Sequence, residues 1–306
     1  MSLSINHLTN DTIKRSEWDE WVRNARNRRM YASSLFLDIF CPRWEALVIE
    51  DGKAFMPLTR NRKFSISYLY QPIFVQQLGL FFRDPGFAEY VPLFIEKLST
   101  LYSFADIAMN EMNIDHCGSI QYTEMNNFLL PLDKPYESVA KQFNSNTRRN
   151  IIKSKRLGTI LVPGFNAGDV VRLFSRHQGK LYPNIRRKNY KMLVSLLERG
   201  MEEGVVEIKS ACTHDRTVIA CVCILKDYDR YVFYFSANTP EGREHGAMFL
   251  LVDSFIRQFS GTGMILDFNG SMNPNIARFY SGFGAQKTSY PRLRINTLPY
   301  PFKLFR

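Results

Sequence analysis

Apolar and polar positions change period between residues 205 and 260, and the changes predict a run of strands followed by a helix. Three apolar runs, 205–213, 217–226 and 230–237, are short and bounded by polar turns, as buried strands are. The tight connections between these runs predict an antiparallel meander. Residues 248–259 instead repeat apolar side chains at helical spacing, which predicts an amphipathic helix.

The spacing of apolar residues predicts the elements of the rest of the chain in the same way. Residues 264–268 predict a further strand and 275–280 a short helix, whereas 136–157 predict one long and strongly basic helix. The remaining elements are helices at 12–28, 33–40, 87–102, 169–181 and 188–201, and strands at 44–49, 53–58, 64–75, 104–109, 119–132, 159–162 and 286–295. This succession predicts a mixed α/β (α+β) protein.

The tripeptide at 133–135, Asp-Lys-Pro, is expected to separate two domains, 1–133 and 134–306. Charge is distributed unequally between them. The first part carries 13 Lys and Arg against 16 Asp and Glu, and the second carries 27 against 13. A basic excess confined to one part favours an anionic partner there, whether a nucleotide-bearing cofactor, an RNA or an anionic lipid surface. The alternative is a solvated basic surface that only aids solubility.

Composition excludes several other classes of protein. Hydrophobic residues make up 45% and charged residues 23%, as in ordinary globular proteins. No apolar run approaches the roughly 20 residues that span a bilayer, and the first residues lack the pattern of a signal peptide, so a cytoplasmic protein is expected. Five cysteines without a Cys-x-x-Cys pair predict reduced, buried thiols, and the scattered histidines predict no metal site.

A strand, a Gly-containing turn and a helix follow one another over 230–259. Such a unit can hold an anionic group at the helix N-terminus, where backbone N–H groups have no intrahelical acceptor. Basic side chains cluster at two other places, both suited to RNA phosphates. The first cluster contains Arg148, Arg149, Lys153, Lys155 and Arg156, and the second contains Arg186, Arg187 and Lys188.

The order of elements over 134–295 resembles the GNAT acyltransferase fold, in particular the tandem-domain type of the Fem peptidyltransferases and their FemAB-like or BioF2-like relatives. Four segments carry the resemblance: 146–158, 243–247, 267–271 and 278–285. It implies tandem GNAT-like domains, each a mixed, mostly antiparallel sheet flanked by helices, with a degenerate N-terminal domain. It also implies that the strands ending at Ala237 and Phe268 part, so that an acyl group can enter the gap.

The resemblance further implies how a cofactor is held. Backbone amides of Glu244, His245, Gly246 and Ala247 are expected to receive phosphates, and Arg243 to add a charged contact. Ser236, Ala237 and Asn238, at the end of the preceding strand, are expected to contact the cofactor as well. The family's loop usually closes on Gly or Ala at the position that Met248 occupies here, and a bulkier residue there crowds the approach of a pyrophosphate.

Two residues are the candidates for catalysis that the resemblance implies. Asp267 follows the second parted strand, and Tyr280 resembles the tyrosine that GNAT enzymes use as an acid. Each also has a purely structural interpretation. Asp267 caps the turn at Asn269 in that case, and Tyr280 packs against neighbouring phenylalanines.

Three functions remain open at this point. The first is acyl transfer from an acyl-CoA, such as acetyl-CoA, to a small-molecule or peptide amine. The second is a Fem-like peptidyltransferase that uses a charged tRNA and modifies a cell-wall precursor, with the basic clusters Arg148, Arg149, Lys153, Arg186 and Arg187 as contacts for phosphate. The third is a non-catalytic GNAT-like protein that binds an anionic ligand or partner.

Overall fold

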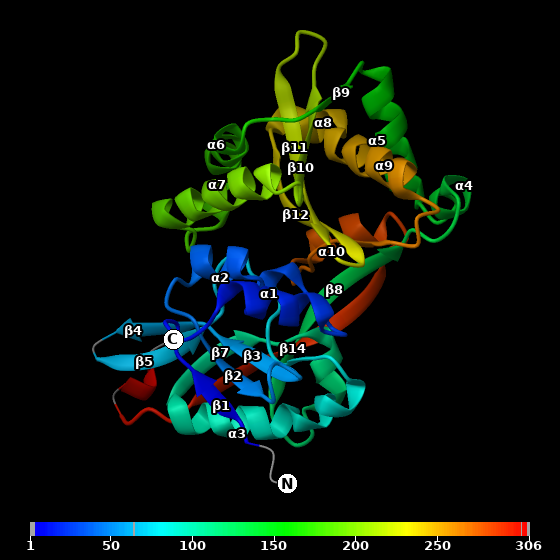
Figure 1. The fold of residues 1–306 in the computed structure, drawn as a ribbon. Coiled ribbons are helices and arrows are strands. Elements are labelled where there is room, and N and C mark those ends of the chain that lie inside the picture. The colour runs from blue at the N-terminus through cyan, green and yellow to red at the C-terminus, as the bar shows by residue number, and fades with distance from the viewer. Residues whose placement is uncertain (1–3, 64, 301, 305–306) are drawn as a thin grey trace. The chain divides into compact units, whose positions relative to one another are not determined.

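The computed structural model describes residues 4–63, 65–300 and 302–304 (Figure 1). The chain forms two compact units, Met1–Met125 with Ser289–Arg306, and Asn126–Thr288. The chain passes between the units within strands β8 and β14. The division expected from the sequence lies at 133/134 instead, and it assigns 289–306 to the second part.

The first unit contains two groups of hydrogen-bonded strands. Strands β1, β2, β3 and β6 form an antiparallel sheet in that order, and the order of the second group is β4, β5, β7, β14. Within the second group only β5 and β7 are parallel. The strands are β1 (Asn6–Leu8), β2 (Glu45–Ile49), β3 (Ala54–Leu58), β4 (Arg60–Lys63), β5 (Ile66–Tyr70), β6 (Phe81–Phe82), β7 (Phe104–Ala108) and β14 (Gln286–Asn296). The helices are α1 (Arg15–Asn24), α2 (Ser34–Phe40) and α3 (Val91–Leu101).

The second unit contains one mixed sheet in the order β8, β13, β12, β11, β10, β9, with helices on both faces (Figure 1). Its strands are β8 (Tyr122–Pro131), β9 (Ile160–Pro163), β10 (Val206–Cys212), β11 (Val218–Asp227), β12 (Arg230–Asn238) and β13 (Ile265–Asp267). Its helices are α4 (Tyr136–Ala140), α5 (Ser145–Arg156), α6 (Ala167–His177), α7 (Arg187–Glu202), α8 (Pro240–His245), α9 (Ala247–Phe259) and α10 (Pro274–Ser281).

The predicted meander is confirmed, because β10 pairs with β11 and β11 with β12, both antiparallel. The predicted single helix over 136–157 is wrong. Asn144 ends the first stretch and caps α5 by accepting a hydrogen bond from the Thr147 amide, so that α4 and α5 are separate helices. The mixed α/β fold class, with mostly antiparallel sheets flanked by helices, is also confirmed.

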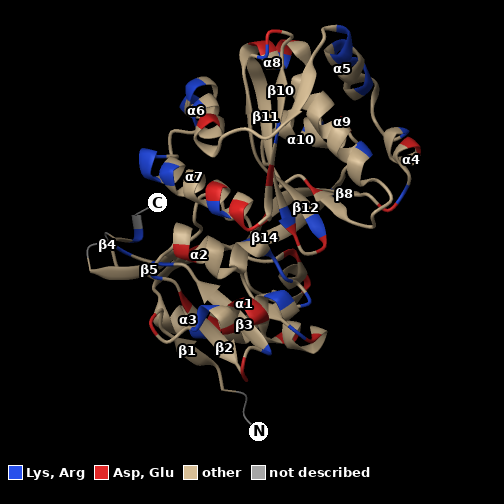
Figure 2. Ribbon diagram, turned by 45° about the horizontal axis from the view of Figure 1, so that its top comes forward, with Lys and Arg blue, Asp and Glu red and all other residues tan. Residues whose placement is uncertain are grey.

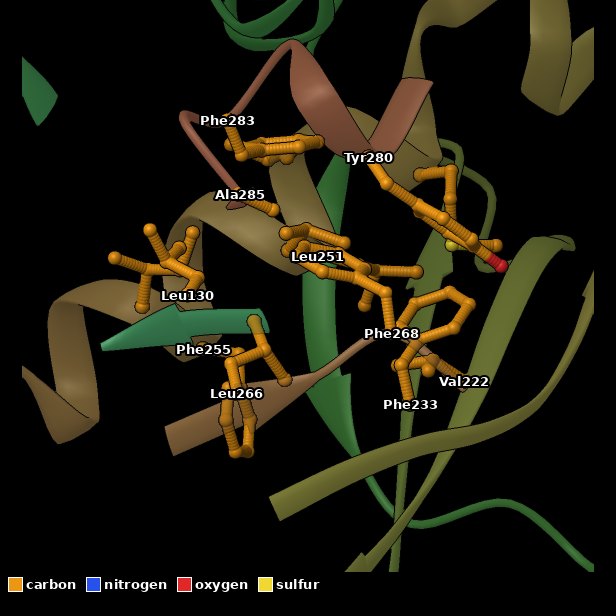
Figure 3. Close-up of a cluster of buried hydrophobic side chains, with 14 of the residues drawn as sticks. Leu130, Val222, Phe233, Leu251, Phe255, Leu266, Phe268, Tyr280, Phe283 and Ala285 are labelled. Carbon is orange, nitrogen blue, oxygen red and sulfur yellow. The ribbon is translucent and has the colours of Figure 1, made fainter. Parts of the chain in front are cut away.

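The core of the second unit forms between the sheet and the apolar faces of α9 and α10 (Figure 3). Leu251 and Phe255 of α9 meet Leu266 of β13 and Phe233 of β12 there, and all four are less than a tenth exposed. Burying such a side chain contributes about 1.5–3 kcal/mol each. This packing fixes β12, β13 and α9 relative to one another, and these three elements surround the candidate site.

Candidate functional site

Strand β13 pairs with β12 over its whole length of three residues, but only with the first three residues of β12. Their parallel register joins Arg230 to Ile265, Tyr231 to Leu266 and Val232 to Asp267, and there it ends. Strand β12 continues to Asn238, whereas the chain after Asp267 turns away through Asn269, whose φ is 61°. The two strands therefore part in the way that the sequence resemblance implies.

A β-bulge in β12 lies directly after the last pair. Against β11, Phe233 is opposite Ile224 and Phe235 is opposite Cys223, so one extra residue, Tyr234, lies between them. A bulge bends its strand and reverses the alternation of side chains. Accordingly Tyr231 packs on Phe255 of α9 at 5.2 Å between ring centroids, whereas Phe235 packs on Phe174 of α6 at 4.7 Å.

The carbonyl of Tyr234 is contacted from the opposite side of the gap. The side-chain amide of Asn269 donates a hydrogen bond to this oxygen over 3.4 Å. At the far end of β12 the amide of Asn238 donates to Oε1 of Gln178 over 2.9 Å. Polar side chains thus satisfy backbone groups where a neighbouring strand would otherwise be needed.

Asp267 is buried at the end of β13, and both of its carboxylate oxygens accept hydrogen bonds. Oδ2 accepts from Nη1 of Arg230 at 2.9 Å and from Nδ2 of Asn127 at 3.3 Å, and Oδ1 accepts from the Asn269 amide at 2.8 Å. Arg230 and Asp267 expose only 4% and 3% of their side chains. These donors fix the position of the Asp267 carboxylate, and a catalytic role for this residue stays a prediction.

Tyr280 of α10 packs its ring on Phe268, with 4.7 Å between centroids and 28° between ring planes. Figure 3 shows its hydroxyl at the edge of the aromatic cluster. The hydroxyl makes no hydrogen bond within the described part of the chain. Burial raises the pKa of Tyr280 above its ordinary value, and the nearby Tyr182 and Asp267 raise the pKa further. The group therefore stays protonated at neutral pH, as a proton donor must.

Residues 239–246, which the sequence predicts as a turn, contain the short helix α8. Thr239 caps it by accepting a hydrogen bond from the Gly242 amide over 2.9 Å, and Pro240 occupies its first position. The left-handed Gly246, with a φ of 71°, separates α8 from α9. The amides of Glu244 and His245 therefore lie inside a helix, where they donate hydrogen bonds to backbone carbonyls.

The start of α9 is covered by α5. A Cβ on Gly246 would lie 2.9 Å from the carbonyl oxygen of Asn150, and Ala247 and Met248 are buried. Arg243 already donates from Nη1 to the Asn238 carbonyl over 3.0 Å. The amides of Glu244 and His245 are thus already used within α8, and the start of α9 is buried. Cofactor binding at these residues stays a prediction.

Two buried polar atoms near this bend lack a hydrogen-bond partner within the described residues. They are Oδ1 of Asn238 and Nδ1 of His245. A buried polar atom without a partner costs about 1–3 kcal/mol, and such atoms gather at functional sites. Asn238 directly precedes α8 and His245 ends it, so of the two atoms only Oδ1 of Asn238 belongs to the strand end that borders the gap.

The basic clusters lie on opposite faces of the sheet. Helix α5 packs against α9, and Arg186 and Arg187 begin α7, which packs with α6 (Figure 2). On α5, Ile152 is 65% exposed, and its neighbours one turn away on either side are all basic: Arg148, Arg149, Lys155 and Arg156. Lys153 is half-buried. An anionic role for either cluster stays a prediction.

Sequence reasoning missed Arg230, Asn269, Tyr182 and Gln178. Arg230 carried a signal, because a charged residue begins an otherwise apolar run and its carboxylate partner ends the next strand. The other three are polar residues in loops, and only the folded chain brings them to the gap.

The described residues contain neither a cluster suited to a metal ion nor a helix long and apolar enough to cross a bilayer. All five cysteines are free and buried.

No protein-family model matches the sequence, and no curated protein matches it either. Several solved structures share the fold. FemX aligns over 94% of this chain and 96% of its own, with a TM-score of 0.67 and 10% identity. The C-terminal domain of a putative lysylphosphatidylglycerol synthetase from Agrobacterium fabrum aligns over 95% of this chain and 93% of its own, with a TM-score of 0.58 and 11% identity. L-PGS from Bacillus licheniformis aligns over 94% of this chain and 93% of its own, with a TM-score of 0.56 and 9% identity. The chain therefore shares the fold of FemX and of these synthetase domains, as the resemblance of its sequence to the FemAB-like type leads one to expect.

Proposed function

We propose that this protein is an N-acyltransferase that transfers an acyl group to the amine of a small molecule or peptide. The parting of β12 and β13 after Val232 supports this proposal most directly. It leaves backbone groups of the bulged strand beside a gap that contains Tyr280 and the carboxylate of Asp267 on its borders. Between the contacts that Asn269 and Gln178 make with β12, an extended acyl donor can pair with the strand edge as a further strand would.

The reaction forms a C–N bond and breaks the bond between the acyl carbon and its leaving group. The amine must lose one proton, and the leaving group must gain one. Tyr280 is suited to the second transfer because it stays protonated at neutral pH. The oxygens of Asp267 already accept hydrogen bonds from three groups, so we expect the amine to enter neutral or to lose its proton through water.

Acyl-CoA stays the donor of this first candidate function. Contacts between its diphosphate and residues 244–247 stay part of this proposal, and the amides of Glu244 and His245 already lie within α8. Thermal unfolding with CoA and acetyl-CoA tests this donor, since a ligand at 100 times its Kd adds about 2.7 kcal/mol to the free energy of unfolding. The absence of any shift with CoA esters would remove acyl-CoA and leave acyl transfer from another donor.

The second candidate is transfer from the aminoacyl ester of a tRNA, and two observations favour it. Helix α5 presents a basic surface of the kind that phosphates bind. The raised pKa of Tyr280 also suits an alkoxide leaving group, which is far more basic than a thiolate. An ester of ribose releases an alkoxide, whereas a CoA thioester releases a thiolate.

Binding of tRNA at increasing salt tests the second candidate. We expect Arg149→Gln to lower both the affinity and the salt slope, the slope by about one for each phosphate that the variant no longer neutralises. The matched control is Arg23→Gln, an exposed arginine of α1 in the first unit and outside both basic clusters, which should change neither. Affinity that is independent of salt would remove this donor. If neither donor binds and no acyl transfer occurs, the non-catalytic interpretation is the correct one.

A further inference from the structure

A cavity of about 320 Å³ lies within the first unit, apart from the gap described above. Its walls come from the ends of β4 and β5, the start of β7, the strand β14 and the segment after β14. The acyl-transfer site uses none of these residues. A cavity of this volume is at the small end of the range for ligand sites, which is about 300–1,000 Å³.

The alternation of side chains along the strands builds the cavity. Leu69 of β5 and Ala105 and Ile107 of β7 point into the core and are less than a twentieth exposed. The intervening residues Tyr68 and Phe104 therefore lie on the other face of the sheet, where they line the cavity. Their rings meet edge to face with 6.2 Å between centroids.

The segment after β14 forms a further wall of the cavity. The Thr297 amide donates to the Ser103 carbonyl over 2.8 Å, and Nδ2 of Asn296 donates to the Lys303 carbonyl over 3.0 Å. These bonds hold the segment in a loop that brings Leu298 and Phe302 to the cavity. Apolar side chains thus line the cavity both from the sheet and from this segment.

Two polar groups at the cavity have hydrogen-bond donors that are not used within the described residues. Nε and Nη2 of Arg292 donate to Oδ1 and Oδ2 of Asp106 at 2.6 and 3.1 Å. Nη1 of Arg292 has no acceptor among the residues that the structure describes, and the same holds for the hydroxyl of Tyr68. The guanidinium therefore has two N–H groups available beside an already neutralised carboxylate.

The charges at the cavity select the sign of a ligand. Lys63 and Arg292 are basic, and Asp106, the acidic group in the lining, is paired with Arg292. Arg294, on the same face of β14, lies 6.0 Å from the centre of the Phe104 ring. The balance is positive, and the groups with spare capacity are donors. An acceptor with negative charge satisfies them, whereas a cation does not.

We propose that this cavity binds a small carboxylate that carries an aromatic ring. The ring lies between Tyr68, Phe104 and Phe302, and the carboxylate accepts hydrogen bonds from Nη1 of Arg292 and the hydroxyl of Tyr68. Two sources share this chemistry: a free aryl-alkanoic acid, and the C-terminus of a peptide that ends in an aromatic residue.

Titration of the full chain, followed by NMR or calorimetry, tests the proposal. The probes are 3-phenylpropionate, the tripeptide Gly-Gly-Phe and 3-phenylpropylamine. We expect saturable binding of at least one acid, with a Kd of about 1 mM or tighter for a ligand of this size. The amine should bind at least about ten times more weakly, because the donors repel it. Whichever acid binds more tightly identifies the source.

Two variants connect this binding to the cavity. Tyr68→Phe removes one donor and Phe104→Leu removes one ring face, and each should raise the Kd of the acids by about 3- to 10-fold. Tyr122→Phe is the matched control, because that tyrosine is outside the lining, and its Kd should equal that of the unmodified chain. Failure of both acids to saturate, equal binding of the amine, or a Kd unchanged by both cavity variants would each overturn the proposal. None of these results bears on acyl transfer.

Discussion

Arg230 and Asp267 form a buried ion pair, 2.9 Å from Nη1 to Oδ2, at the point where β12 and β13 stop pairing. One residue begins β12 and the other ends β13. The pair thus joins the two strands at the base of the gap, and its geometry bears on both stability and function.

Replacing Asp267 with Asn removes the negative charge beside Nη1 of the buried Arg230, while the contact of its Nε with Asp229 at 3.1 Å remains. Breaking a buried pair from one side typically costs about 3–5 kcal/mol, and we expect a loss of about 3 kcal/mol in the free energy of unfolding. Urea denaturation measures it. Asp169→Asn is the control, since it breaks the exposed pair with Arg172 and should cost less than about 1 kcal/mol. Equal losses in both variants would mean that the buried pair has no special part in holding the strands.

Gly242 of α8 is the second residue on which the shape of the gap depends. A Cβ there would lie 2.2 Å from the Ile219 carbonyl oxygen and 2.3 Å from Oδ1 of Asn238. We expect Gly242→Ala to lower the free energy of unfolding by about 1–3 kcal/mol, because the backbone must shift to admit the methyl group. Gly168→Ala, at the start of α6, meets only the end of a side chain at 3.1 Å and should be close to neutral. If both variants unfold at the same urea concentration, α8 does not pack as tightly as described.

Local patterns predicted most of the second unit. The alternation of apolar residues indicated the three strands of the meander, and helical spacing indicated α9, predicted at 248–259 and observed at Ala247–Phe259. The residues for α8 were present as well, since Thr239 is a good cap and Pro240 suits the first helical position. Reading 239–247 as a turn gave too much weight to its two glycines, one of which, Gly246, ends α8.

Other features depend on pairing between distant segments, which a local pattern does not contain. The run Tyr231–Phe235 is apolar throughout, so nothing in it marks Tyr234 as the bulged residue. Strand β14 follows the second unit in the chain yet pairs with β7 of the first, from Arg292↔Ala108 to Asn296↔Phe104. That pairing, together with β8 on β13, sets the limits of the units. The sequence alone offered only the Asp-Lys-Pro tripeptide as a boundary.

The thiols provide a test of burial that is independent of catalysis. Burial raises the pKa of Cys41 and of Cys221 to about 12, and it also raises the pKa of Cys223. The thiolate is the reactive form, so we expect none of the five cysteines to react with Ellman's reagent in the native protein at pH 8. All five should react in denaturant. Rapid reaction of one native thiol would show that its surroundings open to solvent.

The same shifts give the stability a defined pH dependence. A thiol whose folded-state pKa is raised stabilises the fold fully below its unfolded pKa of about 8.5, and this contribution is lost as pH rises through the folded value. The free energy of unfolding should therefore fall between about pH 9 and pH 12. Urea midpoints measured across that range check the direction, and Cys221→Ala should flatten the dependence. A midpoint that rises with pH would contradict the burial of these groups.

Replacing Tyr280 with Phe separates the catalytic interpretation from the structural one. The ring packs on Phe268, while the hydroxyl makes no hydrogen bond within the described chain, so the variant should keep its stability within about 0.5 kcal/mol. If Tyr280 protonates the leaving group, kcat should fall by about 10²- to 10⁴-fold with either donor, with a smaller change in KM.

Because the pKa of Tyr280 is raised, kcat of the unmodified protein should not decline between pH 7 and pH 9.5 through loss of this proton. Tyr231→Phe, a partly buried ring packed against the same core, should leave kcat unchanged. Full activity of Tyr280→Phe would show that the residue only packs, and the proton would then have to come from water.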